Sequence, residues 1–174
     1  RPGSRIDWAI EPQWAPLLCA DSRSPHAARG PEMPVVDELY PVSARRWVRH
    51  PLAASTVTGI LELRRALRAK QYDICIDLQG AIRSALIGRM ASAPRMVGEA
   101  HPREPLARWF FSERIETSGV HVIEQADEVV AAAFGKPIAF LPPTLPTDLL
   151  TEAWCDAWLA ERGIERFVLN PGAG

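Results

Sequence analysis

Apolar and polar residues follow one another along the chain with two different spacings, and each spacing predicts one kind of element. Short apolar runs predict strands at residues 6–10, 35–42, 72–78, 95–98 and 166–170. Longer stretches with apolar positions at helical spacing predict helices at residues 55–70, 82–90, 105–111, 121–134 and 148–162. Because strands alternate with helices, the chain is predicted to be α/β, with a mostly parallel sheet flanked by helices.

Helix-terminating and loop-forming residues mark where these elements end. Ser55 or Thr56 is the expected N-cap of the helix at 55–70, and Gly135 is placed to end the helix at 121–134. Gly163 ends the last helix in the same way. Residues 19–34 combine proline, serine and charged residues without periodicity and are predicted to form a loop, and the four prolines of residues 137–146 indicate an extended linker.

Composition excludes several classes of protein. Hydrophobic residues make up 47% of the chain and charged residues 24%, which is typical of a globular domain. No apolar run approaches the roughly 18–20 residues of a membrane-spanning helix, and the N-terminus has no apolar signal-peptide core. Three widely spaced cysteines argue against a disulfide framework and favour a reducing cytoplasm. The four histidines show no metal-ligand spacing, so no metal is expected.

Charge is distributed unevenly along the chain. Residues 42–108 contain twelve Lys or Arg against five Asp or Glu, a balance of +7. Residues 109–174 contain four basic and ten acidic residues, a balance of -6. The basic segment is either a solvated face with many arginines or a surface for an anionic partner such as a phosphate, a carboxylate, a nucleic acid or a membrane.

The strand at 72–78 carries the first candidate chemistry. Asp77, Gln79 and Gly80 stand where this strand turns into the next helix, which is the carboxyl end of the predicted sheet. Ligands of α/β folds bind at that edge. The simpler alternative is that Asp77 only caps the following helix.

Two arginine-containing segments are further candidates. Residues 43–50 place Arg45, Arg46 and Arg49 around a tryptophan, where guanidinium groups could bind carboxylates or phosphates in bidentate fashion. An exposed basic loop anchored by the tryptophan is the alternative. Arg103 precedes Glu104 and Pro105, and helix initiation alone would explain that sequence.

The end of the chain, residues 167–174, is a predicted strand followed by a turn of small residues. Such turns let backbone N–H groups approach a phosphate, particularly when a helix follows.

Taken together, the order of these motifs resembles the lipopolysaccharide heptosyltransferases of glycosyltransferase family 9, most closely the type I enzymes. The loop at 19–34 departs from the family, which has a shorter link there. The matching segments lie at residues 5–18, 41–51, 72–86, 103–107, 121–126 and 168–174.

This resemblance implies a GT-B architecture, in which two Rossmann-like domains face each other across a cleft. Residues 1–147 would be the N-terminal, acceptor-binding domain without its first strand. Residues 148–174 would be the interdomain helix and the first strand of the donor-binding domain. The family's proposed base, an Asp after the first strand, would lie upstream of Arg1. The chain alone is therefore expected to be inactive.

The implied reaction transfers heptose from ADP-heptose to Kdo-lipid A with inversion and without a metal or other cofactor. The resemblance also implies a peripheral position on the cytoplasmic face of the bacterial inner membrane, next to its anionic surface, and no nucleic-acid partner. Acceptor-binding residues would be Arg45, Arg46, Arg49 and Arg103, with Gln79 and Arg83 as further candidates; donor-binding residues would be Asn170, Gly172 and Ala173.

Two alternatives stay open from the sequence. One is a related GT-B transferase that uses another acidic glycan or lipid acceptor. The other is a non-catalytic module that binds an anion or a nucleotide.

Overall fold

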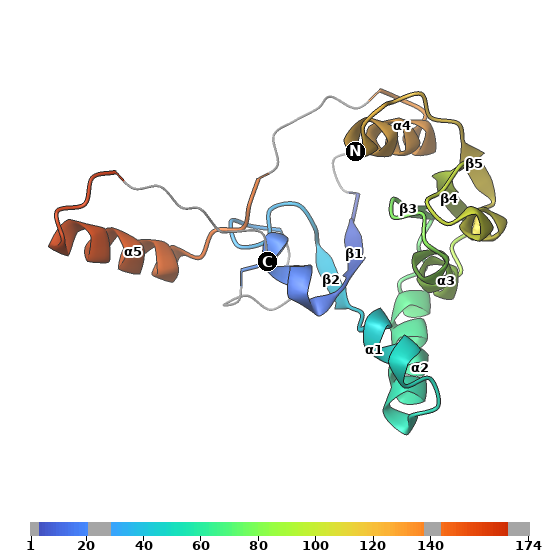
Figure 1. Ribbon diagram of the computed structural model, residues 1–174, viewed down its shortest axis with the longest axis horizontal. Coiled ribbons are helices and arrows are strands. Elements are labelled where there is room, and N and C mark those ends of the chain that lie inside the picture. Colours follow the sequence, from blue (N-terminus) through green and yellow to red (C-terminus); the bar gives the residue numbers. More distant parts are fainter. Residues whose placement is uncertain (1–3, 21–28, 138–143, 167–174) are drawn as a thin grey trace. The chain divides into compact units, whose positions relative to one another are not determined.

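A computed structural model describes residues 4–20, 29–137 and 144–166, and the chain divides into two compact units (Figure 1). One unit comprises Arg1–Ser43 and Pro143–Gly174, and the other comprises Ala44–Pro142. The domain boundary expected at residue 147 stays a prediction.

The first unit contains a pair of parallel strands. β1 (Asp7–Ile10) pairs with β2 (Glu38–Pro41), and Asp7 lies opposite Glu38. Both strands were predicted, but β2 is shorter than residues 35–42. Asp37, just before it, uses its carboxylate to accept the N–H of Ile6 at 2.6 Å and to pair with Arg29 at 2.7 Å.

A small apolar core supports these strands. A short 3-10 helix, η1 (Pro12–Leu17), packs beside β2 and was not predicted. Its proline at the first turn needs no N–H donor, which suits the start of a helix. The buried residues of this core are Cys19, Met33, Val36 and Leu39, with Ile10, Ala15 and Leu18 packed against them.

The last helix, α5 (Leu149–Glu161), belongs to the same unit and lies within the predicted range. Asp148 caps it by accepting the N–H of Leu150 at 3.0 Å. Gly163 follows it with a φ of 62°, as expected of a glycine that ends a helix. Residues 167–170 of the strand predicted at 166–170 and most of the linker at 137–146 lie outside the described residues, as do residues 21–28 of the predicted loop.

The second unit is built on a three-stranded parallel sheet in the order β3-β4-β5. β3 (Ile74–Asp77) and β4 (Arg95–Glu99) were predicted, whereas β5 (Glu113–Ile115) was not. The helix α3 (Ile82–Met90) connects β3 to β4, and the 3-10 helix η2 (Pro105–Phe110) connects β4 to β5. The predicted α/β class, with parallel strands flanked by helices, is confirmed.

Helices cover both faces of this sheet because successive side chains of a strand point to opposite sides (Figure 1). Met96 of β4 packs with Ala85 of α3 and Phe111 on one face. Its neighbour Val97 packs on the other face with Val129 of α4 (Val122–Phe134).

Specific hydrogen bonds define both ends of α4. At its start, the Glu124 carboxylate accepts the N–H groups of Val120 and His121 at 2.9 and 3.1 Å. At its end, Gly135 adopts a φ of 65° and donates its N–H to Ala132, as predicted for this glycine.

The helix α2 (Ala54–Ala69) follows a short helix, α1 (Ala44–Arg49), that was not predicted. The predicted N-cap at Ser55 or Thr56 is wrong: the N-cap is Ala53, and no side chain caps the helix. The Thr56 hydroxyl instead donates to the His50 carbonyl at 2.8 Å. This side chain therefore stabilises the turn between α1 and α2 and does not cap α2.

The absence of a side chain at Gly98 allows a close contact inside the second unit. A Cβ added to Gly98 of β4 would lie 2.5 Å from a ring carbon of Phe111. A Cβ added to Gly59 of α2 would instead meet Trp47 at an ordinary 3.6 Å. The ring of Phe111 therefore occupies the space that a side chain at position 98 would need.

These two glycines give a matched pair of substitutions. We expect Gly98→Ala to lower the free energy of unfolding by about 1–3 kcal/mol, because the added methyl overpacks the core. Gly59→Ala should raise it by about 0.5–1 kcal/mol, because alanine restricts the unfolded chain and fits the helix. Urea unfolding of the two variants tests this, and a loss of stability at position 59 equal to that at 98 would contradict the packing described.

Candidate functional site

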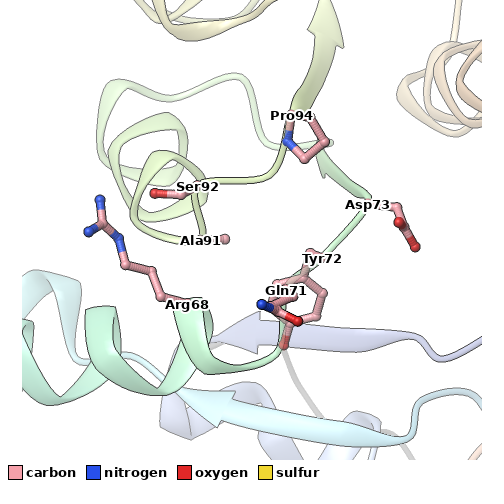
Figure 2. Close-up of a pocket in the computed structure, with 7 residues that line it drawn as sticks. All are labelled: Arg68, Gln71, Tyr72, Asp73, Ala91, Ser92 and Pro94. Atoms are coloured by element: carbon pink, nitrogen blue, oxygen red, sulfur yellow. The ribbon is translucent and has the colours of Figure 1, made fainter.

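Two depressions lie at opposite ends of the β3-β4-β5 sheet. The larger, about 550 Å³, lies at the amino ends of β3 and β4, and Figure 2 shows Arg68 and Ser92 on one side of it and Asp73 on the other. The smaller, about 470 Å³, lies at the carboxyl ends of the same strands. We call the second depression the carboxyl-end cleft.

The amino-end depression is explained by the way two helices end. Gln71 and Ser92 line it and have φ values of 53° and 55°, in the left-handed region. Each follows a helix closely and donates its N–H to a carbonyl of the last turn, that of Arg68 or Arg89. This is the position at which helices commonly adopt a left-handed residue, so the backbone geometry here needs no ligand.

The carboxyl-end cleft combines loop residues with one face of α4. The turn after β3 and the segment after β4 supply its polar residues, and α4 supplies residues at the helical spacing i, i+3, i+4 and i+7. Ligands of α/β folds bind at this edge, which makes the smaller depression the better candidate site. The cleft is lined by Asp77, Leu78, Gln79, Gly80, Glu99, His101, Arg103, Val122, Gln125, Ala126 and Val129.

Asp77 shapes the turn that forms one wall of the cleft. Its carboxylate is buried and accepts the N–H groups of Gln79 and Gly80 at 2.8 and 3.1 Å. The Ser84 hydroxyl of α3 lies 2.9 Å from the same carboxylate. The alternative that Asp77 only caps the next helix is wrong in detail: the N-cap of α3 is Ala81, and Asp77 bonds the turn before the helix and the Ser84 hydroxyl within it.

Gly80 lets the segment after β4 approach this turn. Its φ is 62°, and an added Cβ would lie 2.9 Å from the backbone nitrogen of Arg103. The Gly80 carbonyl accepts the N–H of Glu104 at 2.8 Å, and the Glu104 carboxylate accepts the N–H of Ile82 at 2.9 Å. The two hydrogen bonds of Glu104, to the Gly80 carbonyl and from the Ile82 N–H, thus hold the neighbouring backbone of Arg103 at the cleft.

Four polar side chains surround the open part of the cleft. Glu99 accepts a hydrogen bond from Thr117 at 2.7 Å, and His101 lies 3.1 Å from Glu116. Gln79 and Arg103 are exposed, and within the described part of the chain their side chains make no hydrogen bond or ion pair. An amide and a guanidinium are therefore available to a ligand.

Among the described residues, neither a reactive cysteine nor a metal site is found near this edge of the sheet. Burial, together with the charge of Asp77, raises the pKa of the Cys75 thiol to about 11, so the thiol stays protonated at neutral pH. Within residues 4–20, 29–137 and 144–166, no three His, Cys, Asp or Glu side chains are grouped so that they could hold a metal ion. That the reaction needs no metal stays a prediction.

The structure brings together two of the predicted acceptor residues, Gln79 and Arg103, which both line the cleft. Arg83 lies in the first turn of α3 and is half-buried. The exposed residues Arg45, Arg46 and Arg49 lie on α1, and neither they nor Arg83 belong to the described lining of the cleft. The predicted donor residues Asn170, Gly172 and Ala173 lie outside the described residues.

Several lining residues were missed by sequence reasoning. Glu99 comes directly after the strand predicted at residues 95–98 and is the last residue of β4, so the rule that pointed to Asp77 could have found it as well. Gln125 and Ala126 belong to the motif at residues 121–126, but only the structure shows that this side of α4 faces the cleft.

Comparison with known proteins assigns the chain to a family. Residues 60–167 match the sequence profile of glycosyltransferase family 9 (heptosyltransferase). The chain belongs to this family. It is 33% identical over 137 residues to lipopolysaccharide heptosyltransferase 1 of Salmonella typhimurium, covering 77% of this chain and 39% of that protein. Lipopolysaccharide heptosyltransferase 1 of Pseudomonas aeruginosa is 26% identical over 140 residues, covering 79% of this chain and 36% of that protein.

Solved structures place this family-9 chain in the GT-B fold over part of its length. It matches E. coli heptosyltransferase WaaC with ADP at a TM-score of 0.64 and 28% identity, covering 80% of this chain and 41% of that one. WaaC with ADP-2-deoxy-2-fluoro heptose gives a TM-score of 0.66 at 30% identity, covering 81% and 42%. The chain thus spans about two fifths of the length of these relatives.

Two glycines of the second unit test how the cleft is built. Gly80 and Gly135 both have positive φ values, but only Gly80 has backbone within 3 Å of its missing Cβ. We expect Gly135→Ala to lower the free energy of unfolding by about 1 kcal/mol, the cost of left-handed alanine. Gly80→Ala should cost about 2 kcal/mol or more, because it also pushes against Arg103. Thermal unfolding measures both, and equal losses would argue against the close approach.

Proposed function

We propose that this chain is the acceptor-binding portion of a lipopolysaccharide heptosyltransferase. The protein that contains it would transfer heptose from ADP-heptose to Kdo-lipid A, with inversion at the anomeric carbon and without a metal. Membership of the family supports glycosyl transfer, and the names of the similar proteins support heptose and lipopolysaccharide as the sugar and the acceptor class.

The observation that carries the acceptor role is the exposed Arg103 guanidinium at the carboxyl-end cleft. Kdo is a sugar acid and lipid A is phosphorylated, so each offers an oxyanion pair that a guanidinium can bind through two parallel hydrogen bonds. Gln79 and Glu99 line the same cleft and can bond to sugar hydroxyl groups. The charge and the polar groups of the cleft thus fit an acidic sugar.

Inverting transfer requires a base that removes the proton of the acceptor hydroxyl. Asp77 is unsuited to that role, because its buried carboxylate already accepts two backbone N–H groups and contacts Ser84. We propose, as the resemblance to the family implies, that the base is a carboxylate outside this chain. The 174 residues alone are accordingly proposed not to transfer heptose.

Donor binding is proposed to involve Asn170, Gly172 and Ala173. The solved structures that this chain resembles are titled as complexes with ADP and with an ADP-heptose analogue, which supports a nucleotide-sugar donor for the whole protein. Arg45, Arg46, Arg49 and Arg83 are proposed as further contacts to the acidic acceptor.

The acceptor is anchored in a bilayer, so we propose that the protein works at the cytoplasmic face of the inner membrane. None of the helices in the described ranges has the length and apolar character needed to cross a membrane. The balance of +7 over residues 42–108 supports attraction to an anionic lipid surface.

The test is an acceptor-dependent assay on the protein that contains this chain. We expect Arg103→Ala to lower kcat/KM for Kdo-lipid A roughly ten- to a hundredfold, because a charge-assisted hydrogen bond is lost, while KM for ADP-heptose stays unchanged. Arg103→Lys should recover only part of the loss, because an ammonium cannot replace the planar fork. ADP release measures both.

Arg89→Ala is the matched control, because Arg89 is exposed on α3 about 10 Å along the helix axis from Ile82, away from the cleft. It should leave both kinetic constants unchanged. An Arg103→Ala enzyme with wild-type kcat/KM for the acceptor would overturn the proposed role of the cleft. Turnover only with a different acidic glycan or lipid would favour a related transferase.

A further inference from the structure

We propose that η2 is the surface through which this protein docks on an anionic phospholipid bilayer. The surface consists of Leu106, Trp109 and two arginines, Arg108 and Arg114, and we call it the η2 surface. The inference rests on the proposed function for its setting, since a membrane-bound acceptor requires a protein that works at the membrane.

The geometry of the 3-10 helix creates an exposed apolar ridge. Leu106 is 62% exposed and Trp109 is 67% exposed. The two residues are three positions apart, and a 3-10 helix has three residues per turn, so their side chains leave the helix on the same side. Ala107 anchors η2 to the rest of the unit, because it is fully buried in the core that contains Met96 of β4.

Two guanidinium groups flank the indole. The Arg108 and Arg114 guanidinium carbons lie 5.3 and 5.5 Å from the centre of the Trp109 ring, within the range of cation–π contacts. The Nε of Arg114 also donates to the Arg108 carbonyl at 3.1 Å, which fixes its side chain beside the ring. An apolar ring with charges held at its sides suits the bilayer interface, where tryptophan is enriched.

The acidic residues of this segment are engaged elsewhere. The Glu104 carboxylate accepts the N–H of Ile82, and Glu113 pairs with Arg95 at 2.6 Å. Among the described residues, neither Arg108 nor Arg114 has a carboxylate partner. Their positive charge is therefore available to the phosphates of anionic lipids.

The size of the ridge favours a bilayer over a protein partner. A specific protein interface usually buries about 1,000 Å² or more, whereas the apolar part of this surface consists of two side chains. Shallow insertion of a leucine and a tryptophan beside basic residues is the usual mode of interfacial membrane binding. η2 begins two residues after Arg103, so the η2 surface follows the cleft directly in the chain, and docking would hold the protein at the bilayer that carries its acceptor.

The experiment measures binding of the protein that contains this chain to vesicles, without donor or acceptor. Vesicles of phosphatidylcholine alone are compared with vesicles that contain about one third phosphatidylglycerol, at low salt and at about 0.15 M salt. We expect binding to the anionic vesicles only, weakened by salt, with a blue shift of tryptophan fluorescence.

Substitutions then locate the surface. Leu106→Ser with Trp109→Ser should weaken binding at least about tenfold, because the apolar insertion is lost. Arg108→Gln with Arg114→Gln should weaken it about 25-fold, since each arginine near an anionic surface contributes about fivefold. Trp109→Leu, which keeps an apolar side chain, should retain most of the binding, and an unchanged circular dichroism spectrum of the serine variant shows that its loss of binding is not due to misfolding.

Trp154→Ser is the matched control, because Trp154 on α5 is 65% exposed, almost as much as Trp109. It should bind vesicles like the wild type. Wild-type protein that binds neither vesicle, or η2 variants that bind as well as the wild type, would overturn the proposal, as would binding to an acidic protein or a nucleic acid in place of the vesicles. Vesicle binding needs no heptose transfer, so this result is independent of the transferase assay.

Discussion

The polar edge of the second unit depends on the hydrogen bonds that the Asp77 carboxylate accepts from the turn after β3. A charged group this deeply buried is stable only when its oxygens are bonded, and two backbone N–H groups and a serine hydroxyl lie within bonding distance. These bonds hold Gly80 in a left-handed conformation, with no Cβ between its backbone and that of Arg103. The segment that carries Arg103 packs against that backbone, so one buried carboxylate indirectly positions the exposed cation of the cleft.

This arrangement separates the residues that build the site from those that can use it. Glu104 and Pro105 start η2, as a purely structural interpretation of their sequence predicts, and the Glu104 carboxylate also accepts the N–H of Ile82 at the start of α3. Arg103, which precedes them in the chain, and Gln79, in the turn after β3, have exposed side chains at the cleft. The motif at residues 103–107 thus contains residues that build the structure and a residue that is available to a ligand. Its presence alone does not show which of them contacts the ligand.

Sequence reasoning was most successful where local signals were strong. Periodicity predicted β3, β4 and the long helices, and the alternation of elements predicted a parallel sheet. It missed β5, because three residues carry too little pattern, and α1, because its arginines suggested a loop. The approach of Arg103 to Gly80 could not be predicted, since it joins residues 23 positions apart and depends on the packing of two connections.

The central claim is that an acidic sugar binds at the carboxyl ends of β3 and β4. Chemical-shift mapping by NMR, with a soluble Kdo-bearing fragment of the acceptor added to the protein that contains this chain, tests it directly. We expect the largest shifts at the backbone amides of Gln79, Gly80 and Arg103. Shifts confined to the turns at Gln71 and Ser92, at the opposite end of the sheet, would contradict it.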